Sequence, residues 1–413
     1  MDKIFYQNAP KSEIRAISSK SEAHRYLICA ALGDRECEMI CTDTNADIDA
    51  TVACLNALGA EIKRTENGFF VKPITEVRKN QSLDCNESGS TLRFLLPLAA
   101  SLGADCELLM RGRLSERPLS PLYEILQSGG VTLSPQGSNP LAVKGKLASG
   151  DYTVAANISS QYISGLLFAL SLADGDSTLT LDGKVESAPY IGMTLDALTA
   201  FGADIQYNES DKRFKIKGKD RLHSPERVIV GGDWSNAAFF LVAGAIGKDP
   251  VTLCSLDENS RQGDREILAI LEKMGAKITR KDGKITVFPS ALHGTLIDAS
   301  NIPDLVPILA VAASVADGET KIFNAARLRL KESDRIESVC NTLTTLGATV
   351  TPTDDGMMIC GKKALAGGEV DSYNDHRIAM SAAIASLVCE KAVKISRFEA
   401  INKSYPSFAE NFN

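Results

Sequence analysis

The chain has 413 residues, and its 45 Lys and Arg against 52 Asp and Glu give a formal charge of −7 at pH 7. This length indicates two or three domains, and the content of 44% hydrophobic and 23% charged residues excludes a disordered, collagen-like or coiled-coil chain. The acidic balance argues against general binding to nucleic acid or anionic membranes.

No segment suggests export or membrane insertion. The longest apolar stretch, residues 237–247, falls short of the roughly 18 residues that suggest a membrane span, and residues 1–10 are too polar for a signal peptide. Ten Cys without a CxxC pair and four His without ligand spacing favour a reducing, cytoplasmic location with no disulfide framework and no metal site.

The predicted elements begin with two β-like stretches, residues 3–6 and 14–17, and a long repeat follows them. Leu-rich helical runs end on marker glycines spaced 71, 72, 73 and 72 residues apart: Gly59, Gly130, Gly202, Gly275 and Gly347. Other apolar helices close on a second series spaced 70, 72, 72 and 71 apart: Gly33, Gly103, Gly175, Gly247 and Gly318. Glycine suits the position just past a helix, where the backbone turns left-handed.

Each helical run continues into alternating β-type sequence, such as residues 276–280, a turn at Asp282-Gly283, and residues 284–288. The repeat therefore predicts a two-lobed, inside-out α/β barrel of six βαβαββ units, three in each domain. The sixth unit lacks its hairpin, and we expect residues 3–6 and 14–17 to complete it in space.

Three units per lobe give an N-terminal lobe of residues 18–225 and a C-terminal lobe of residues 1–17 and 226–413. The chain would then cross between the lobes twice, near residues 15–20 and 222–228. Two crossings predict a hinge.

Basic residues recur at or beside the predicted helix starts, where the helix dipole favours acidic ones. They are Lys20, Arg117, Lys331, Arg335, Arg377 and Lys403. If these starts share one cleft, the cations repel each other and need an anionic ligand. Since the chain has no Walker-type Gly-rich loop, a small, multiply anionic ligand fits better than a nucleoside triphosphate.

Each of these residues also has an ordinary structural interpretation. A single Arg or Lys is commonly a solvated or paired side chain, and Glu332 and Asp334 are local partners for such pairs. The Ser runs and Asp304 are typical of helix caps, and His376 of a structural hydrogen bonder.

Six motifs, taken together, resemble the 5-enolpyruvylshikimate-3-phosphate synthase family of enolpyruvyl transferases from about Lys11 to the C-terminus. They are residues 19–25, 87–93, 116–118, 330–335, 374–377 and 403–406, which read SKSEAHR, ESGSTLR, ERP, LKESDR, NDHR and KSYP. The resemblance implies transfer of the enolpyruvyl group of phosphoenolpyruvate to the 5-hydroxyl of shikimate 3-phosphate, with release of phosphate through a tetrahedral intermediate. It implies no metal or organic cofactor, and our default expectation is a monomer.

Carried over by position, the resemblance assigns two sets of binding residues. The shikimate 3-phosphate set is Lys20, Ser21, Arg25, Ser159, Ser160, Gln161, Ser187, Tyr190, Asp304 and Lys331. The phosphoenolpyruvate set is Lys20, Gly89, Arg117, Gln161, Arg335, Arg377 and Lys403. Asp304 and Glu332 are the candidates for proton exchange, and Lys20 and Lys331 would stabilise charge or relay a proton.

Two positions depart from the family pattern, since Glu87 and Arg327 stand where Asn is common.

The closest rival is UDP-N-acetylglucosamine 1-carboxyvinyltransferase, but this chain has Lys20-Ser21-Glu22 in place of Lys-Asn-Ala, and residues 110–118 lack the rival's reactive Cys. RNA 3′-phosphate cyclase is disfavoured by the acidic balance. A rival of another class is a non-catalytic repeat scaffold, which predicts cations that are spread over all units or matched by neighbouring acids, whereas the sequence places them in units one, two, five and six, with neutral Ser and Gln in unit three.

Overall fold

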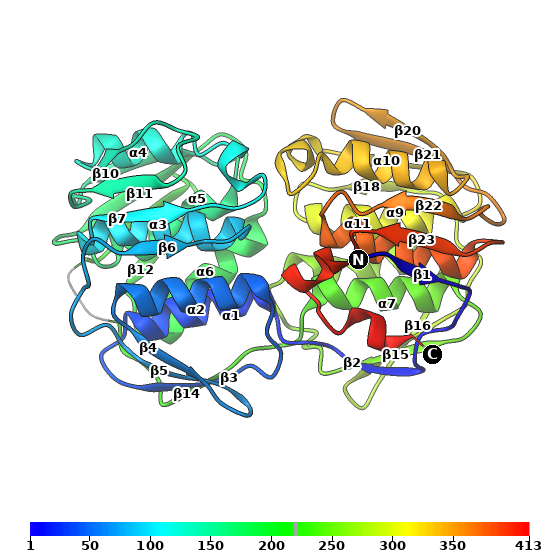
Figure 1. Ribbon diagram of the computed structural model, residues 1–413, viewed down its shortest axis with the longest axis horizontal. Coiled ribbons are helices and arrows are strands. Elements are labelled where there is room, and N and C mark those ends of the chain that lie inside the picture. The colour runs from blue at the N-terminus through cyan, green and yellow to red at the C-terminus, as the bar shows by residue number, and fades with distance from the viewer. Residues whose placement is uncertain (219–221, 413) are drawn as a thin grey trace. The chain divides into compact units, whose positions relative to one another are not determined.

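The computed structural model describes residues 1–218 and 222–412 (Figure 1). The chain forms two compact units, one of Ser18–Val230 and one of Met1–Ile17 with Gly231–Asn413. The division falls five residues after the expected 225/226 boundary, because strand β14 (Arg227–Ile229) pairs in parallel with β3 (Cys37–Ile40) and so belongs to the first of these units.

The Ser18–Val230 unit contains three four-stranded sheets. In each, two parallel strands are followed by an antiparallel hairpin. The first sheet has the order β14-β3-β5-β4, with β5 (Gly68–Lys72) and β4 (Glu61–Arg64). The second is β6 (Ser82–Asp84), β7 (Cys106–Leu109), β9 (Leu141–Lys144) and β8 (Thr132–Leu133), and the third is β10 (Asp151–Ala155), β11 (Ser177–Asp182), β13 (Arg213–Ile216) and β12 (Ile205–Asn208).

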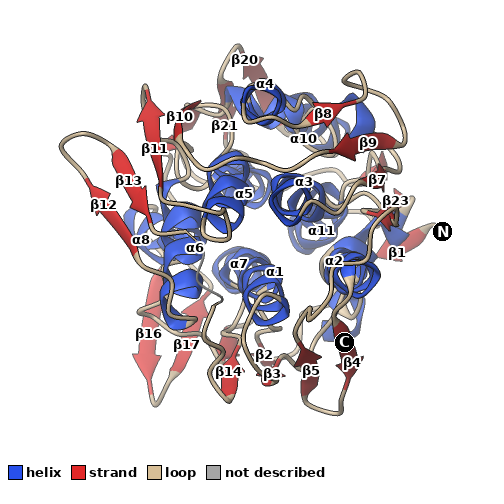
Figure 2. Cartoon of the chain, turned by 90° about the vertical axis from the view of Figure 1, so that its left-hand side faces the viewer, coloured by secondary structure: helices blue, strands red, loops and turns tan. Residues whose placement is uncertain are grey.

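The helices of this unit are α1 (Lys20–Ala31), α2 (Ala46–Leu58), α3 (Gly89–Leu102), α4 (Leu122–Ser128), α5 (Ser160–Leu170) and α6 (Ala188–Ala200). Three of them, α1, α3 and α5, lie at the centre of the unit in Figure 2, and the other three lie nearer its edge. The apolar faces of these helices meet in one core cluster.

Helices α3 and α5 pack closely beside Pro97, which lies inside α3. Proline lacks the N–H that would bond the carbonyl of Arg93, and Gly165 of α5 occupies the space beside that carbonyl. A Cβ at Gly165 would lie 2.2 Å from the Arg93 oxygen, so the contact requires glycine.

The other unit repeats the pattern with one shortened sheet. Its sheets are β2 (Glu13–Arg15), β15 (Val251–Cys254), β17 (Lys284–Phe288) and β16 (Lys277–Lys281); β18 (Leu296–Asp298), β19 (Glu319–Phe323), β21 (Gly356–Cys360) and β20 (Thr349–Thr353); and β1 (Lys3–Phe5), β23 (Val393–Ser396) and β22 (Gly368–Asp371). Its helices are α7 (Trp234–Ile246), α8 (Ile267–Lys273), α9 (Val306–Ser314), α10 (Arg335–Thr345) and α11 (His376–Ala385), which share a second core cluster.

The predicted fold class, six repeats with three in each unit, is confirmed, but one strand assignment was wrong. Strand β1 completes the last sheet beside β23, as expected for residues 3–6. Residues 14–17 do not join that sheet, because β2 pairs in parallel with β15. Strands β2 and β14 are thus exchanged between the units. Strand β2 completes a sheet of one unit, although the helix that follows it, α1, belongs to the other, and the same holds for β14 and α7.

The marker glycines separate into two groups. All five of the first series have positive φ, from 77° at Gly202 to 122° at Gly59, as a helix end in the left-handed region requires. In the second series only Gly103 and Gly318 do, so the left-handed role expected for Gly33, Gly175 and Gly247 was wrong. The predicted turn at Asp282-Gly283, with φ of 52° and 70°, joins β16 to β17.

Candidate active site

The expected site residues fall into one set per unit, and each set is described separately. All of them are buried or half-buried. Four arginines are less than one-tenth exposed, and the side chain of Lys331 is about one-quarter exposed; the arginines are Arg25, Arg117, Arg335 and Arg377. Charged groups are normally solvated, so this burial indicates specific partners.

In the Gly231–Asn413 part of the chain, Asp304 is the centre of a cluster of charges. It lies in a short 3-10 helix, η3 (Pro303–Leu305), just before α9. Its carboxylate accepts from Arg335 Nη1 at 2.9 Å and from Arg377 Nη2 at 2.9 Å, and Lys331 Nζ lies 3.8 Å away. Burial acts to raise the pKa of Asp304, but Arg377, Lys331 and Arg335 outweigh it and hold the pKa well below its usual range.

Arg335 is almost completely buried and is held by three carboxylates. Its Nη2 donates to Glu332 at 2.7 Å, and its Nε donates to Asp375 at 2.8 Å. Asp375 also accepts from the Ser333 hydroxyl at 3.1 Å and caps α11 through the backbone N–H of Arg377. Asp375 therefore orients the Arg335 guanidinium and caps the helix that carries Arg377. Sequence reasoning assigned it no role although it stands in the NDHR motif.

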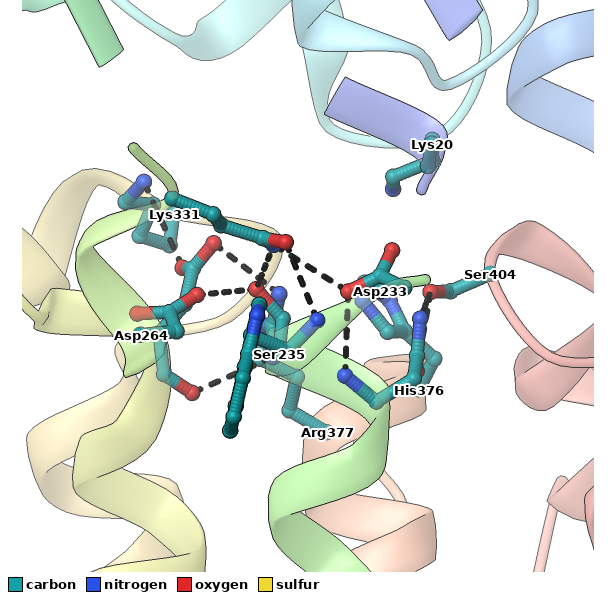
Figure 3. Close-up of polar contacts among 12 residues, drawn as sticks. Lys20, Asp233, Ser235, Asp264, Lys331, His376, Arg377 and Ser404 are labelled. Carbon is teal, nitrogen blue, oxygen red and sulfur yellow. Dashed lines mark hydrogen bonds and ion pairs between the residues drawn. The ribbon is translucent and has the colours of Figure 1, made fainter. Parts of the chain in front are cut away.

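Lys403 donates from Nζ to the carbonyl of Asn374 at 2.6 Å, which brings it to the loop that precedes α11. Figure 3 labels Lys331 and Arg377 together with polar side chains at the start of α7. There Asp233 caps the helix, Gln262 donates to Asp233 and Ser235, and Ser235 donates to the buried Asp264. Nothing in the sequence pattern had marked Gln262 or Asp264.

In the Ser18–Val230 unit, Lys20 is the first residue of α1 and pairs with Asp47 of α2 at 2.7 Å. Gly89 is the first residue of α3, and Ser88 caps that helix by accepting from the Thr91 N–H at 3.2 Å. The guanidinium groups of Arg93 and Arg117 lie so close over Gly89 that a Cβ there would be 2.7 and 2.9 Å from their Nη1 atoms. A helix start beneath two guanidinium groups suits an anion.

The remaining residues of this unit line the starts of α5 and α6. Ser159 caps α5 through the Gln161 N–H, and the Gln161 side chain reaches Ser90 Oγ at 3.0 Å. Ser187 precedes α6 in a left-handed conformation, with φ of 53°. Arg25 donates to the carbonyls of Ser21 at 2.6 Å and Tyr190 at 2.9 Å.

The structure corrects two expectations about the cations. Arg117, Lys331 and Lys403 do not start α-helices: Arg117 follows the 3-10 helix η1 (Leu114–Glu116), Lys331 follows η4 (Ala326–Leu330), and Lys403 ends η6 (Phe398–Lys403). The predicted repulsion is also largely offset near Asp304, because carboxylates lie between the cations.

Glu87 and Arg327, the two departures from the family pattern, are both in contact with the backbone of neighbouring segments. The Glu87 carboxylate lies against Gly112, and Arg327 donates to the carbonyl of Ser300. In the described ranges 1–218 and 222–412, no group of three or more His, Cys, Asp or Glu side chains could hold a metal ion. Within the same ranges, no helix has both the length and the apolar character of a membrane span.

The two units, each of three sheets with helices, have the fold of solved enolpyruvyl transferases. The crystal structure of the enolpyruvyl transferase NikO from Streptomyces tendae has this fold, with a TM-score of 0.80 over 100% of this chain and 96% of that one, at 17% identity. EPSP synthase from Acinetobacter baumannii matches with a TM-score of 0.81 and 27% identity, over 99% of this chain and 97% of its own.

The chain belongs to the EPSP synthase (3-phosphoshikimate 1-carboxyvinyltransferase) family, whose match spans residues 6–412. A curated relative from Clostridium kluyveri, named 3-phosphoshikimate 1-carboxyvinyltransferase, is 43% identical over 97% of this chain and 94% of its own length. One of the same name from Clostridium perfringens is 42% identical over 97% of this chain. The family predicted from the six motifs is therefore confirmed.

Proposed function

We propose that this chain transfers the enolpyruvyl group of phosphoenolpyruvate to the 5-hydroxyl of shikimate 3-phosphate and releases phosphate. The names of its relatives support this reaction, and the observation that carries it is the presence of two arrangements of buried arginine side chains. One is Gly89 beneath Arg93 and Arg117, and the other is Arg335 with Arg377. Both substrates are anions that such guanidinium groups can bind in a bidentate manner.

The first set of residues is assigned to phosphoenolpyruvate. Arg117, Arg335 and Arg377 would bind its phosphate and carboxylate, and the start of α3 at Gly89 would offer backbone N–H groups to it. The full set is Lys20, Gly89, Arg117, Gln161, Arg335, Arg377 and Lys403.

The second set is assigned to shikimate 3-phosphate. The starts of α5 and α6 present hydroxyl groups of Ser159, Ser160 and Ser187, which suit a phosphate and a polyhydroxylated ring. The full set is Lys20, Ser21, Arg25, Ser159, Ser160, Gln161, Ser187, Tyr190, Asp304 and Lys331. We propose that both sets serve one reaction.

Proton exchange is assigned to Asp304 and Glu332. In the addition step the 5-hydroxyl oxygen bonds to C2 of phosphoenolpyruvate and gives its proton to Asp304, while Glu332 delivers a proton to C3. In the elimination step the C–O bond to phosphate breaks, the leaving phosphate takes the proton from Asp304, and the methyl group returns a proton to Glu332, which restores the double bond. Lys20 and Lys331 would stabilise the charge that develops on oxygen.

The depressed pKa of Asp304 sets a condition on this assignment. A carboxylate held by Arg335 and Arg377 is a weak base. An anionic substrate that binds both arginines takes over part of their charge, which raises the pKa of Asp304 and makes it a stronger base in the complex than in the free protein.

The test is release of phosphate from phosphoenolpyruvate, measured with and without shikimate 3-phosphate, and with UDP-N-acetylglucosamine in parallel. We expect release only with shikimate 3-phosphate. Release only with the sugar nucleotide would reassign the acceptor. If no phosphate is released and calorimetry detects binding of neither substrate, a non-catalytic scaffold would be favoured.

We also propose that the protein is monomeric, cytoplasmic and hinged where the chain passes between its two units. Ten free cysteines support a reducing compartment. A solution mass near 44 kDa by light scattering would support the monomer, and twice that mass would reject it.

A further inference from the structure

Helix α1 carries two adjacent basic residues that lead to separate buried polar chains. His24 and Arg25 are 1% and 3% exposed, and each binds side chains of a different neighbouring helix. Neighbouring positions on a helix point about 100° apart, so the two side chains diverge. All the residues involved lie in the Ser18–Val230 unit.

The first chain connects His24 to the start of α3. His24 Nδ1 lies 2.8 Å from Thr51 Oγ1 of α2, which lies 2.7 Å from Thr91 Oγ1 of α3. The Thr91 hydroxyl donates to Ser88 Oγ at 2.8 Å and is 3.4 Å from the carbonyl of Asp47. The chain therefore ends at Ser88, which caps the helix that begins with Gly89, and beside Asp47, which pairs with Lys20.

The donors in this chain follow one direction. A hydroxyl donates only one proton, so when Thr91 donates to Ser88, Thr51 donates to Thr91 and the N–H at Nδ1 of His24 donates to Thr51. Burial, followed by Lys20 and Arg25, lowers the pKa of His24 well below its usual value and so keeps the ring neutral, and the direction of the donors places its one proton on Nδ1.

The second chain connects Arg25 to α5 and α6. Arg25 Nε donates to Thr194 Oγ1 at 2.8 Å, and Thr194 Oγ1 lies 2.7 Å from Ser164 Oγ. The Arg25 guanidinium also donates to the carbonyls of Ser21 and Tyr190. Ser164 lies one helical turn after Ser160, so this chain supports the starts of the helices assigned to shikimate 3-phosphate.

We propose that the two chains position the two substrates separately: Thr51 and Thr91 set the affinity for phosphoenolpyruvate, and Thr194 sets the affinity for shikimate 3-phosphate. The inference rests on the proposed function and adds positioning residues that contact neither substrate. Each chain has no exposed member, so the loss of one hydroxyl leaves a buried polar group unsatisfied and shifts the helix start that it holds.

The experiment compares two matched substitutions, Thr51→Val and Thr194→Val, which replace a hydroxyl by a methyl group of similar size. We expect Thr51→Val to raise the KM for phosphoenolpyruvate roughly tenfold, with the KM for shikimate 3-phosphate changed less than about twofold. Thr194→Val should give the reverse, and calorimetry should show weaker binding of shikimate 3-phosphate to Thr194→Val only. Thr51→Ser and Thr194→Ser keep the hydroxyl and should restore the respective constants.

Circular dichroism checks that each variant folds. If Thr51→Val does not fold, Thr91→Val interrupts the first chain at another point. The inference would be overturned if both KM values rose equally in Thr51→Val and Thr194→Val, or if the Ser variants showed the same rises. Turnover by the wild-type protein would still support the proposed function in that case. Absence of turnover dependent on shikimate 3-phosphate in the wild-type protein would reject the proposed function, and the inference with it.

Discussion

Replacement of Asp304 by Asn tests the charge cluster most directly. The amide keeps the size of the carboxylate but removes the negative charge between Arg335 and Arg377. Glu332 and Asp375 still pair with Arg335, so the guanidinium that loses most is Arg377, which is buried. Asp304→Asn should therefore destabilise the unit that contains it and also impair proton transfer.

The expected loss of stability follows from the two short contacts. At 2.9 Å and an effective dielectric constant of 20, each charge pair is worth about 6 kcal/mol before desolvation is subtracted. Breaking a buried pair by removing one partner costs roughly 3 to 5 kcal/mol, and the two remaining carboxylates favour the lower end of that range. We expect about 3 kcal/mol in the free energy of unfolding, and a loss of kcat of roughly 10² to 10⁴.

The pH dependence has a definite sign. Because the pKa of Asp304 is depressed in the folded protein, its contribution to stability is fully present above its unfolded pKa of about 4 and is lost as the pH falls further. The difference in stability between the wild-type protein and Asp304→Asn should therefore stay constant above about pH 5 and begin to shrink as the pH falls below about 4.

The single Trp of the chain makes this measurement specific. Trp234 is fully buried in the same unit as Asp304, so its fluorescence during urea unfolding reports on that unit. The matched control is Asp371→Asn, which removes the carboxylate of an exposed pair with Arg397 and should cost less than about 1 kcal/mol. Equal urea midpoints for Asp304→Asn and the control at neutral pH, or a difference that does not shrink at all between about pH 5 and pH 3, would refute the reasoning.

Three further substitutions test other features. Gly89→Ala should raise the KM for phosphoenolpyruvate, because the new Cβ would displace the guanidinium of Arg117; an unchanged constant at saturating shikimate 3-phosphate would contradict this. Gly165→Ala should destabilise the protein by about 1 to 3 kcal/mol or more, since its Cβ meets a backbone oxygen at 2.2 Å, and a thermal unfolding curve that matches the wild type would count against that contact. Among the ten thiols, Cys360 alone is exposed, so a thiol reagent should give one fast phase that Cys360→Ser removes.

The repeat could be predicted from the sequence because its signals are local. A helix that ends on a left-handed glycine, such as Gly59 or Gly347, depends on residues within one turn, and the same holds for the hairpin turn at Asp282-Gly283. The exchange of β2 and β14 could not be predicted. Each strand has only three residues, and its parallel partner lies about 190 to 240 positions away in the chain, so local pattern carries no information on which sheet it completes.

The residues of the candidate site could likewise be predicted from the sequence only in part. Residue type and helix position were enough to mark Lys20, Arg335 and Arg377, since cations near helix starts are unusual in any sequence. The neutralisation of these cations by Asp304 and Asp375, and the hydroxyl chains that leave His24 and Arg25, were decided only by tertiary structure. The physical reason is that the charge or hydrogen bond a buried side chain feels depends on groups within a few ångströms, and here those groups come from segments tens to well over a hundred residues away.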